Sequence, residues 1–456
     1  MRRLLTAALA LSVVAALAAR ADFLPYDAVR PLLEALPEAV PTELRVPDEA
    51  RRMAWPGWIA EHDRQIRTRL AKGDADTIVN WALFGTSFTT RPRVSLQPGE
   101  PPEQLAALVA GRLNDLVAAL RAAGQNERRV FARTFFEAQG FSLATEDGRT
   151  RLAAHLAAEV SRVAAESRAY AAELSRARTA ADATADFAAR SKVFRDRGLS
   201  LDTSLQPSFA LDRALRDLKA RGLLAPGSVR RAAIIGPGLD FSDKSAGVDV
   251  FAQQTLQPFM LIDSLRRLDL APPRATDLGL ATFDISPRVN SHLARARATA
   301  ARGASYVLHF PLDPALPWRP DFLDYWRTAG STIGRNAGDA RGVSGESTLQ
   351  VRTVTVRGDV VLRVTPVDLN VVTQRHAGAP FDLIVATNVL VYYDTLDQSL
   401  ALKNIEHMLN PGGLLLSNNA LLELPGARMR SAGYTTTVYS DRPDDGDHIV
   451  WYRRDQ

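Results

Sequence analysis

Cysteine is absent from this chain of 456 residues. A chain without cysteine forms no disulfide bond, binds no metal through thiolates and has no thiolate nucleophile. Lysine is scarce as well, because only five of the 56 basic residues are lysines, and the positive charge therefore comes mostly from arginine. The composition, with 46% apolar and 23% charged residues, is that of an ordinary globular protein whose length suits two or three domains.

Basic blocks and metal-ligand spacings are also missing. The net charge of +5 is spread along the chain, so no nucleic-acid partner is expected. The seven histidines show none of the spacings that zinc sites use, so no metal site is predicted. The chain contains no Gly-x-Ser-x-Gly sequence, which leaves a serine hydrolase without support.

Long apolar runs are confined to the first 22 residues. Arg2 and Arg3 precede an apolar segment at residues 4–18, and Ala19-Arg20-Ala21 has the form of a signal-peptidase site. This pattern predicts a signal peptide at residues 1–21 and export to the periplasm or the exterior; a cytoplasmic location follows if the signal is misread. The apolar segment is short for a transmembrane helix, and no span is expected after cleavage.

Residues 22–195 are predicted to form a helical domain. Apolar residues recur at steps of three and four in residues 105–120, 127–139 and 147–190, which is the spacing of one helix face. Six prolines divide residues 23–60, so short helices and extended connections are expected there. Trp55 and Trp58 are interpreted as packing residues, with a stacking platform for a sugar or a base as the alternative.

One polar break interrupts the helical pattern at residues 84–91. The break contains Gly85 and a run of serine and threonine residues. One interpretation is a connection between two helices, in which the hydroxyl side chains cap helix ends. The other is a loop that reaches over a neighbouring site and contacts a substrate.

The second half of the chain begins with an apolar segment that ends in glycine. Residues 231–235 form this segment, and Gly236-Pro237-Gly238 follows directly. The pattern predicts a buried parallel strand whose glycine turn lets the backbone approach a ligand closely. The dinucleotide fingerprint requires a third glycine at position 241, where this chain has Phe241, so NAD and FAD are disfavoured.

Three later apolar segments also end in polar residues, and the whole series resembles the class I S-adenosylmethionine (SAM)-dependent methyltransferases. The segments end at Asp284, at Asp368 and at Thr387-Asn388. The resemblance covers about residues 229–454 and implies SAM as the cofactor. It implies an α/β fold at residues 196–456, a Rossmann-like sheet of seven strands that ends in an antiparallel hairpin. The implied cofactor-binding residues are Gly236, Pro237, Gly238, Asp240, Asp284, Ile285, Asp368, Leu369, Thr387 and Asn388.

The resemblance also implies a role for each carboxylate. Asp240 is available to the ammonium group of SAM, and Asp284 accepts the ribose hydroxyls. Asp284 follows Gly238 by 46 residues, where about 20 are usual, and a long loop at residues 242–254 accounts for the difference. Asp368 either accepts from the adenine amino group or caps the segment that follows it.

Residues 381–394 resemble the strand-four motif, and in particular the Asn-Val-Leu-x-Tyr-aromatic run of the chemotaxis-receptor glutamate methyltransferases. Thr387 stands where that family has arginine, and the partner-binding elements of that family are not recognisable, so its substrate is not carried over. Alignment and desolvation supply most of the catalysis of methyl transfer, which makes a base optional. If a base exists, Tyr392, Tyr393 or Asp394 is the candidate, although core packing explains the tyrosines equally well.

Residues 303–366 are interpreted as an insertion before the third strand of the sheet. A hairpin of residues 348–356 and 359–365, turning at Arg357-Gly358, is predicted inside it. The insertion either covers the substrate side of the site or decorates the surface.

Two functional hypotheses follow from these patterns. The first is a SAM-dependent methyltransferase that acts on a small molecule or on an exported protein. The second is an exported, non-catalytic binding protein that keeps the methyltransferase scaffold, because SAM is made in the cytoplasm. The patterns identify neither the methyl acceptor nor the oligomeric state.

Overall fold

The computed structural model describes most of the chain. The described residues are 21–94, 102–179, 204–241, 249, 251–274, 277–339, 349–418, 420–424, 426–442 and 445–455. Four predictions lie wholly or mainly outside these ranges: the signal peptide, the domain boundary near residue 195, the helical pattern beyond residue 179, and most of the loop at residues 242–254.

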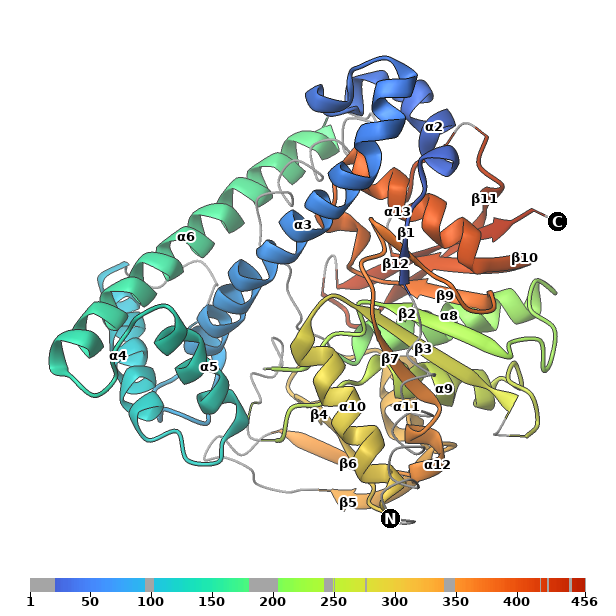
Figure 1. The fold of residues 1–456 in the computed structure, drawn as a ribbon. Coiled ribbons are helices and arrows are strands. Elements are labelled where there is room, and N and C mark those ends of the chain that lie inside the picture. The colour runs from blue at the N-terminus through green and yellow to red at the C-terminus, as the bar shows by residue number, and fades with distance from the viewer. Residues whose placement is uncertain are drawn as a thin grey trace, which may run out of the picture.

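A seven-stranded sheet forms the centre of the C-terminal half (Figure 1). Its strands are β2 (Arg231–Ile235), β3 (Gly279–Asp284), β7 (Val364–Asp368), β9 (Phe381–Ala386), β10 (Leu409–Ser417), β11 (Met429–Val438) and β12 (Gly446–Arg454). The order is β11-β12-β10-β9-β2-β3-β7, in which β12 runs antiparallel to both of its neighbours and the other pairs are parallel. The predicted fold class and the predicted C-terminal hairpin are therefore confirmed.

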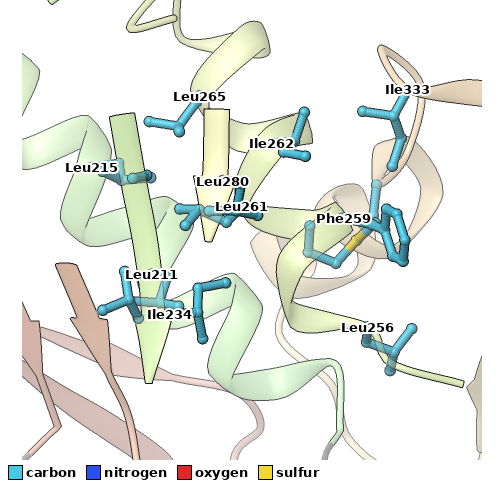
Figure 2. Close-up of a cluster of buried hydrophobic side chains, with 14 of the residues drawn as sticks. Leu211, Leu215, Ile234, Leu256, Phe259, Leu261, Ile262, Leu265, Leu280 and Ile333 are labelled. Carbon is cyan, nitrogen blue, oxygen red and sulfur yellow. The ribbon is translucent and has the colours of Figure 1, made fainter. Parts of the chain in front are cut away.

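Both faces of the sheet are covered, which explains why its central strands carry apolar residues on both faces. Ala232 and Ile234 of β2 face one core, whereas Ala233 and Ile235 face the other. The first core is packed by α8 (Gln206–Ala220), α9 (Gln257–Arg267) and α10 (Pro287–Ala301), and Figure 2 shows Leu211, Ile234 and Phe259 meeting there. The second core is packed by α13 (Thr395–Met408), α2 (Tyr26–Ala35) and the first half of α3 (Asp48–Phe84).

The N-terminal half is helical, as predicted. After β1 (Ala21–Phe23) it contains α2, the 3-10 turns η1 (Pro37–Ala39) and η2 (Thr42–Leu44), α3, α4 (Pro102–Arg121), α5 (Glu127–Ala138) and α6 (Glu146–Thr179). The long helices α3 and α6 lie side by side in Figure 1, and ion pairs join them, among them Lys72 to Glu166 and Arg162 to Asp76. No helix in the described part of the chain is long and apolar enough to cross a bilayer.

The expectation of short helices between residues 23 and 60 is wrong from Asp48 onwards. There α3 begins and continues for 37 residues, with Pro56 inside it. Proline removes one helical hydrogen bond, but Trp55 and Ile59 beside it are each only 1% exposed. The burial of these side chains contributes about 1.5–3 kcal/mol each, which offsets the loss at proline. The buried Trp55 indole also donates to the Leu24 carbonyl oxygen at 2.7 Å, which fits its interpretation as a packing residue.

The insertion forms a small sheet of its own, and the hairpin predicted inside it is wrong. Strand β6 (Gln350–Val356) pairs antiparallel with β4 (Tyr306–Leu312) and with β5 (Gly334–Asp339), while α11 (Pro320–Thr328) lies between β4 and β5 in the chain. The residues expected to form its partner strand instead form the short helix α12 (Gly358–Val361) and the start of β7. Pairing with two earlier strands, β4 and β5, outweighs the local turn signal. The short strand β8 (Gln374–His376) pairs with β1.

Candidate functional site

The glycine turn after β2 has the backbone conformation that its sequence predicts. Gly236 and Gly238 have φ angles of 64° and 70°, which side chains other than glycine rarely adopt. A Cβ atom at position 236 would lie 2.5 Å from Val389 Cγ2. Strand order reverses at β2, because β3 lies on one side and β9 on the other, and ligands of open α/β sheets bind at such a point.

The two acids predicted on neighbouring strands come together at this edge. Asp284 and Asp368 are register partners at the ends of β3 and β7. Asp284 is buried, and its Oδ1 atom accepts from the Ser286 backbone N–H at 2.7 Å. Burial, together with the negative charge of Asp368, raises the pKa of Asp284 to about 7. The site thus holds a desolvated acceptor that a pair of hydroxyl donors would satisfy.

Asp240 is held from the insertion side. Gln254 donates from Nε2 to Asp240 Oδ2 at 3.0 Å and to the His309 carbonyl oxygen at 2.9 Å, and His309 lies on β4. Thr255 donates to the Gly238 carbonyl oxygen at 3.1 Å. The insertion therefore supports the turn that carries the predicted SAM contacts, which sequence analysis did not anticipate.

Thr387 and Asn388 end β9 next to the glycine turn. Gln257 at the start of α9 donates to Thr387 Oγ1 at 2.6 Å. Asn388 has a φ angle of 57°, one of two positive values among the described non-glycine residues, and its backbone N–H donates to Asn418 Oδ1 at 2.8 Å. Asparagine tolerates this conformation better than most residues do, so Asn388 suits a sharp exit from the strand.

The three candidate bases have structural surroundings of their own. Asp394 is the N-cap of α13 and accepts from the Asp397 N–H at 3.0 Å. Tyr393 is 4% exposed in the second core, and burial raises the pKa of its phenol further above the usual value. Tyr392 lies in the turn η4 (Leu390–Tyr392) and is partly buried. Their catalytic roles stay predictions, as do the cofactor contacts of Pro237, Ile285 and Leu369.

Helix α3 contributes residues to this edge that sequence analysis missed. Arg67 donates to Asp368 Oδ1 at 2.7 Å and to the Ile285 carbonyl oxygen at 3.5 Å. Arg69 donates to the Tyr392 carbonyl oxygen at 2.9 Å. These contacts join residues about 220 to 320 positions apart in the chain, and nothing in the helical pattern marks the two arginines, so only the folded structure could find them.

The polar break at residues 84–91 does reach the sheet domain, but it contacts a loop residue. Asp249 follows β2 and is fully buried. It accepts from the N–H and hydroxyl groups of Thr86 at 2.9 and 2.8 Å and from those of Ser87 at 2.9 and 2.6 Å, and Trp81 donates to it as well. The break therefore joins the helical region to the loop of the glycine turn, and a contact with substrate stays a prediction.

Phe241, which replaces the third glycine of a dinucleotide fingerprint, is part of the same junction. Its ring is buried among helical residues and lies 5.5 Å from the Trp81 ring and 5.6 Å from the Phe131 ring. Arg128 of α5 donates to the Phe241 carbonyl oxygen. Phe241 thus anchors the helical region. In dinucleotide-binding folds a glycine at this position lets the following helix pack closely against the strand, and the Phe241 side chain does not allow that packing. Within the described ranges no three histidine or acidic residues cluster as metal ligands would.

Comparison with known proteins gives one family match. Residues 346–423 match the family model described as "CheR methyltransferase, SAM binding domain". The matched segment contains Asp368, Thr387 and Asn388, and it confirms the resemblance drawn from the strand-four motif. No curated protein matches the chain.

Several solved methyltransferases resemble the chain weakly. The N-methyltransferase NodS from Bradyrhizobium japonicum WM9 is 15% identical, with 54% of this chain and 98% of that chain covered and a TM-score of 0.26. Magnesium protoporphyrin IX methyltransferase (ChlM) from Synechocystis PCC 6803 is 11% identical, with 54% and 79% covered and a TM-score of 0.26. At these scores the likeness carries no argument about the substrate.

The family match and the sheet support the same assignment. The match covers β6 to β10, and the glycine turn and Asp284 lie before it in the chain, at the ends of the adjacent strands β2 and β3. The C-terminal half of this chain has the seven-stranded fold of SAM-dependent methyltransferases, and its residues 346–423 are similar to the SAM-binding domain of CheR methyltransferases.

Proposed function

We propose that this chain transfers the methyl group of SAM to a small molecule or to an exported protein. The observation that carries the proposal is the convergence of the glycine turn, Asp284 and Asp368 at one edge of the sheet. SAM supplies a methyl group on a positively charged sulfonium, which needs no metal and no strong base for its transfer. A site with carboxylates and no phosphate cradle suits such a cation.

The residues of the chain would bind and orient. Asp284 would accept the ribose hydroxyls, because its buried carboxylate has one N–H donor in the described structure. The glycine turn would bring backbone close to the methionyl part, since Gly236 and Gly238 carry no Cβ atoms. Arg67 would hold Asp368 in place beside the adenine. Leu369, which is 1% exposed, would pack beneath Asp368 and the adenine ring.

Titration calorimetry of SAM and of S-adenosylhomocysteine into the mature chain from Asp22 tests the proposal. Micromolar binding that is lost in Gly238→Arg and in Asp284→Ala is the expected result. Asp321→Ala is the matched control, because Asp321 of α11 is a half-exposed aspartate whose Arg213 partner is 3.9 Å away. Unchanged binding in both site variants would overturn the site, and no binding at millimolar ligand would favour the non-catalytic alternative.

Export is the second part of the proposal and rests on residues 1–21. Cleavage before Asp22 would leave two of the three β1 residues, Asp22 and Phe23, paired with Arg375 and Gln374 of β8. The mature N-terminus would therefore remain attached to the fold. N-terminal sequencing of protein recovered from the periplasm or the medium should read Asp-Phe-Leu-Pro, and an unprocessed chain confined to the cytoplasm would contradict export.

A further inference from the structure

A hollow lies at the opposite edge of the sheet, where β2 and β3 begin. Its volume is about 550 Å³, and Pro226, Gly227, Arg266, Pro272, Thr332 and Arg357 are among its lining residues. The Gly227 N–H donates to the Asp269 carbonyl oxygen, and the Val229 N–H to the Leu270 carbonyl oxygen, so the wall is tied to both strand starts. The size suits a small molecule.

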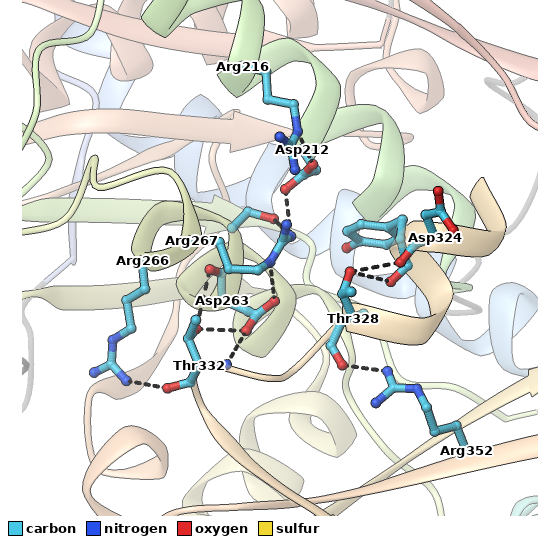
Figure 3. Close-up of polar contacts among 12 residues, drawn as sticks. Asp212, Arg216, Asp263, Arg266, Arg267, Asp324, Thr328, Thr332 and Arg352 are labelled. Carbon is cyan, nitrogen blue, oxygen red and sulfur yellow. Dashed lines mark hydrogen bonds and ion pairs between the residues drawn. The ribbon is translucent and has the colours of Figure 1, made fainter. Parts of the chain in front are cut away.

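Two arginines converge on this hollow from different elements. Arg266 is in the last turn of α9, and Arg357 precedes α12. Their Nη1 atoms donate to the same carbonyl oxygen of Thr332, at 3.4 and 3.1 Å, and Figure 3 shows the contact of Arg266. Arg357 Nε also donates to Asp359 Oδ1 at 3.2 Å. One carbonyl oxygen and one carboxylate oxygen satisfy only a small part of the ten N–H donors that two guanidinium groups carry.

The nearby acids balance only part of the positive charge at this place. Asp359 pairs with Arg357 Nε at 3.2 Å, and both side chains are about half exposed. Asp263 accepts from Arg267 Nε at 2.9 Å and from the Thr332 N–H and hydroxyl at 2.9 and 2.7 Å, as Figure 3 shows. Asp269 lines the hollow but is 81% exposed, and its partner is Lys219 at 3.6 Å. Asp263 and Asp269 are therefore committed elsewhere or turned to solvent, and Asp359 is shared with Arg357 alone among the two arginines.

Arg266 shows the consequence of this imbalance. Its Nη2 atom is buried and has no hydrogen-bond partner within the described ranges. Burial lowers the pKa of Arg266, the positive charges of Arg357 and Arg363 lower it further, and the negative charges of Asp359 and Asp263 offset part of this lowering. A guanidinium with a buried nitrogen that lacks an acceptor is costly unless an acceptor or a counter-charge comes close.

We propose that this hollow binds the anionic group of a small molecule, a phosphate or a carboxylate, between Arg266 and Arg357. Such a group offers two or more oxygens to the paired forks of the guanidinium groups. The proline walls would contact the apolar part of the same molecule. The site lies at the amino ends of the strands, whereas the SAM site lies at their carboxyl ends, so the proposal does not depend on methyl transfer.

The test uses inorganic phosphate and succinate as separate probes, at constant ionic strength set with chloride. The unfolding temperature of the full mature chain should rise with at least one probe. Titration calorimetry should then give the dissociation constant of that probe. Arg357→Gln should weaken binding, with a dissociation constant at least tenfold higher. It is the decisive variant because the Arg357 side chain is 45% exposed and its loss should leave the fold intact. Arg266→Gln should weaken binding similarly if it folds.

Arg213→Gln is the matched control, since Arg213 is 47% exposed on α8 and its partner Asp321 is 3.9 Å away. A stronger response to phosphate would identify a phosphorylated ligand, and a stronger response to succinate a carboxylated one. Either response supports the site if it is lost in Arg357→Gln and kept in Arg213→Gln. No response to either probe, or equal responses in all variants, would overturn the proposal. Asp284→Ala should leave the response unchanged.

Discussion

The two edges of the central sheet are chemically opposite. At the carboxyl edge Asp240 and Asp284 are buried acids, Gly236 and Gly238 have positive φ angles, and α3 lies across the strand ends. At the amino edge two arginines line an open hollow, and the nearby acids are paired or exposed. The positive dipole ends of α9 and α10 point to the first edge and their negative ends to the second, which favours acids and cations respectively.

The difference shows how one scaffold keeps two kinds of binding chemistry apart. Cations such as SAM suit the acidic edge, and anions suit the basic edge. The two edges also differ in how far the helical region covers them. The helical region contacts the ends of β2, β3, β7 and β9 and the loops after them, but it leaves the hollow at the amino edge open. Five predictions test this contrast, in order of decreasing effect.

Asp249→Ala should destabilise the protein most, because it leaves the donors of Trp81, Thr86 and Ser87 buried without an acceptor. The free energy of unfolding should fall by about 3 kcal/mol or more, since each unsatisfied buried donor costs about 1–3 kcal/mol. Urea unfolding followed by tryptophan fluorescence measures it. Asp269→Asn at the amino edge is the control and should change stability by less than about 0.5 kcal/mol; equal losses would show that the junction contributes nothing special.

Gly236→Ala should cost about 2 kcal/mol, because the new Cβ would combine a strained positive φ with a 2.5 Å approach to Val389. Gly279 is the first residue of β3, and a Cβ there would meet nothing within 4 Å. Gly279→Ala should therefore be close to neutral. Chemical unfolding of the pair compares a glycine at each edge, and a neutral Gly236→Ala would show that the turn does not need glycine.

SAM affinity should rise with pH through about 7. Because the pKa of Asp284 is raised to about 7, its carboxyl group is mostly neutral below that pH and cannot act as a charged acceptor. The association constant should increase about tenfold per pH unit below 7 and level off above about 8. Calorimetry between pH 5.5 and 8.5 measures the profile. Asp284→Asn should bind weakly with a flat profile, and a flat profile in the unaltered chain would contradict this role.

The raised pKa has a matching effect on stability without ligand. A carboxyl group whose pKa is higher in the folded state favours folding in its protonated form. The contribution of Asp284 to stability should therefore decrease as pH rises from its ordinary pKa of 3.8 to about 7. Asp284→Asn removes this dependence in unfolding experiments.

Asp368→Asn should have the smallest effect. The negative charge of Asp368 raises the pKa of Asp284, but burial is the larger cause. The midpoint of the SAM-binding profile should therefore move below 7 by less than about one unit, which corresponds to less than about 1.4 kcal/mol. Asp321→Asn serves as a control that should leave the midpoint unchanged. A midpoint that moves upward would mean that the two acids do not interact as their register suggests.

Much of the fold could be predicted because its signals are local. The apolar run before Gly236, the helical spacing at residues 105–120 and the hairpin at the C-terminus all formed as expected. The failures came from long-range packing. Helix α3 continues through Pro56 because two neighbouring side chains are buried, and β6 found partners on both sides instead of a hairpin partner.

The sequence by itself determined the class of sheet and the residues at its carboxyl edge. Strand periodicity, glycine at positive φ and acids at strand ends follow from backbone sterics and from the direction of parallel strands. Tertiary structure alone decided which residues that are distant in the sequence come into contact. Arg67 with Asp368, the break at residues 84–91 with Asp249, and Arg266 with Arg357 are 91 to 301 positions apart. No local pattern encodes such contacts, because packing selects them only after the elements have formed.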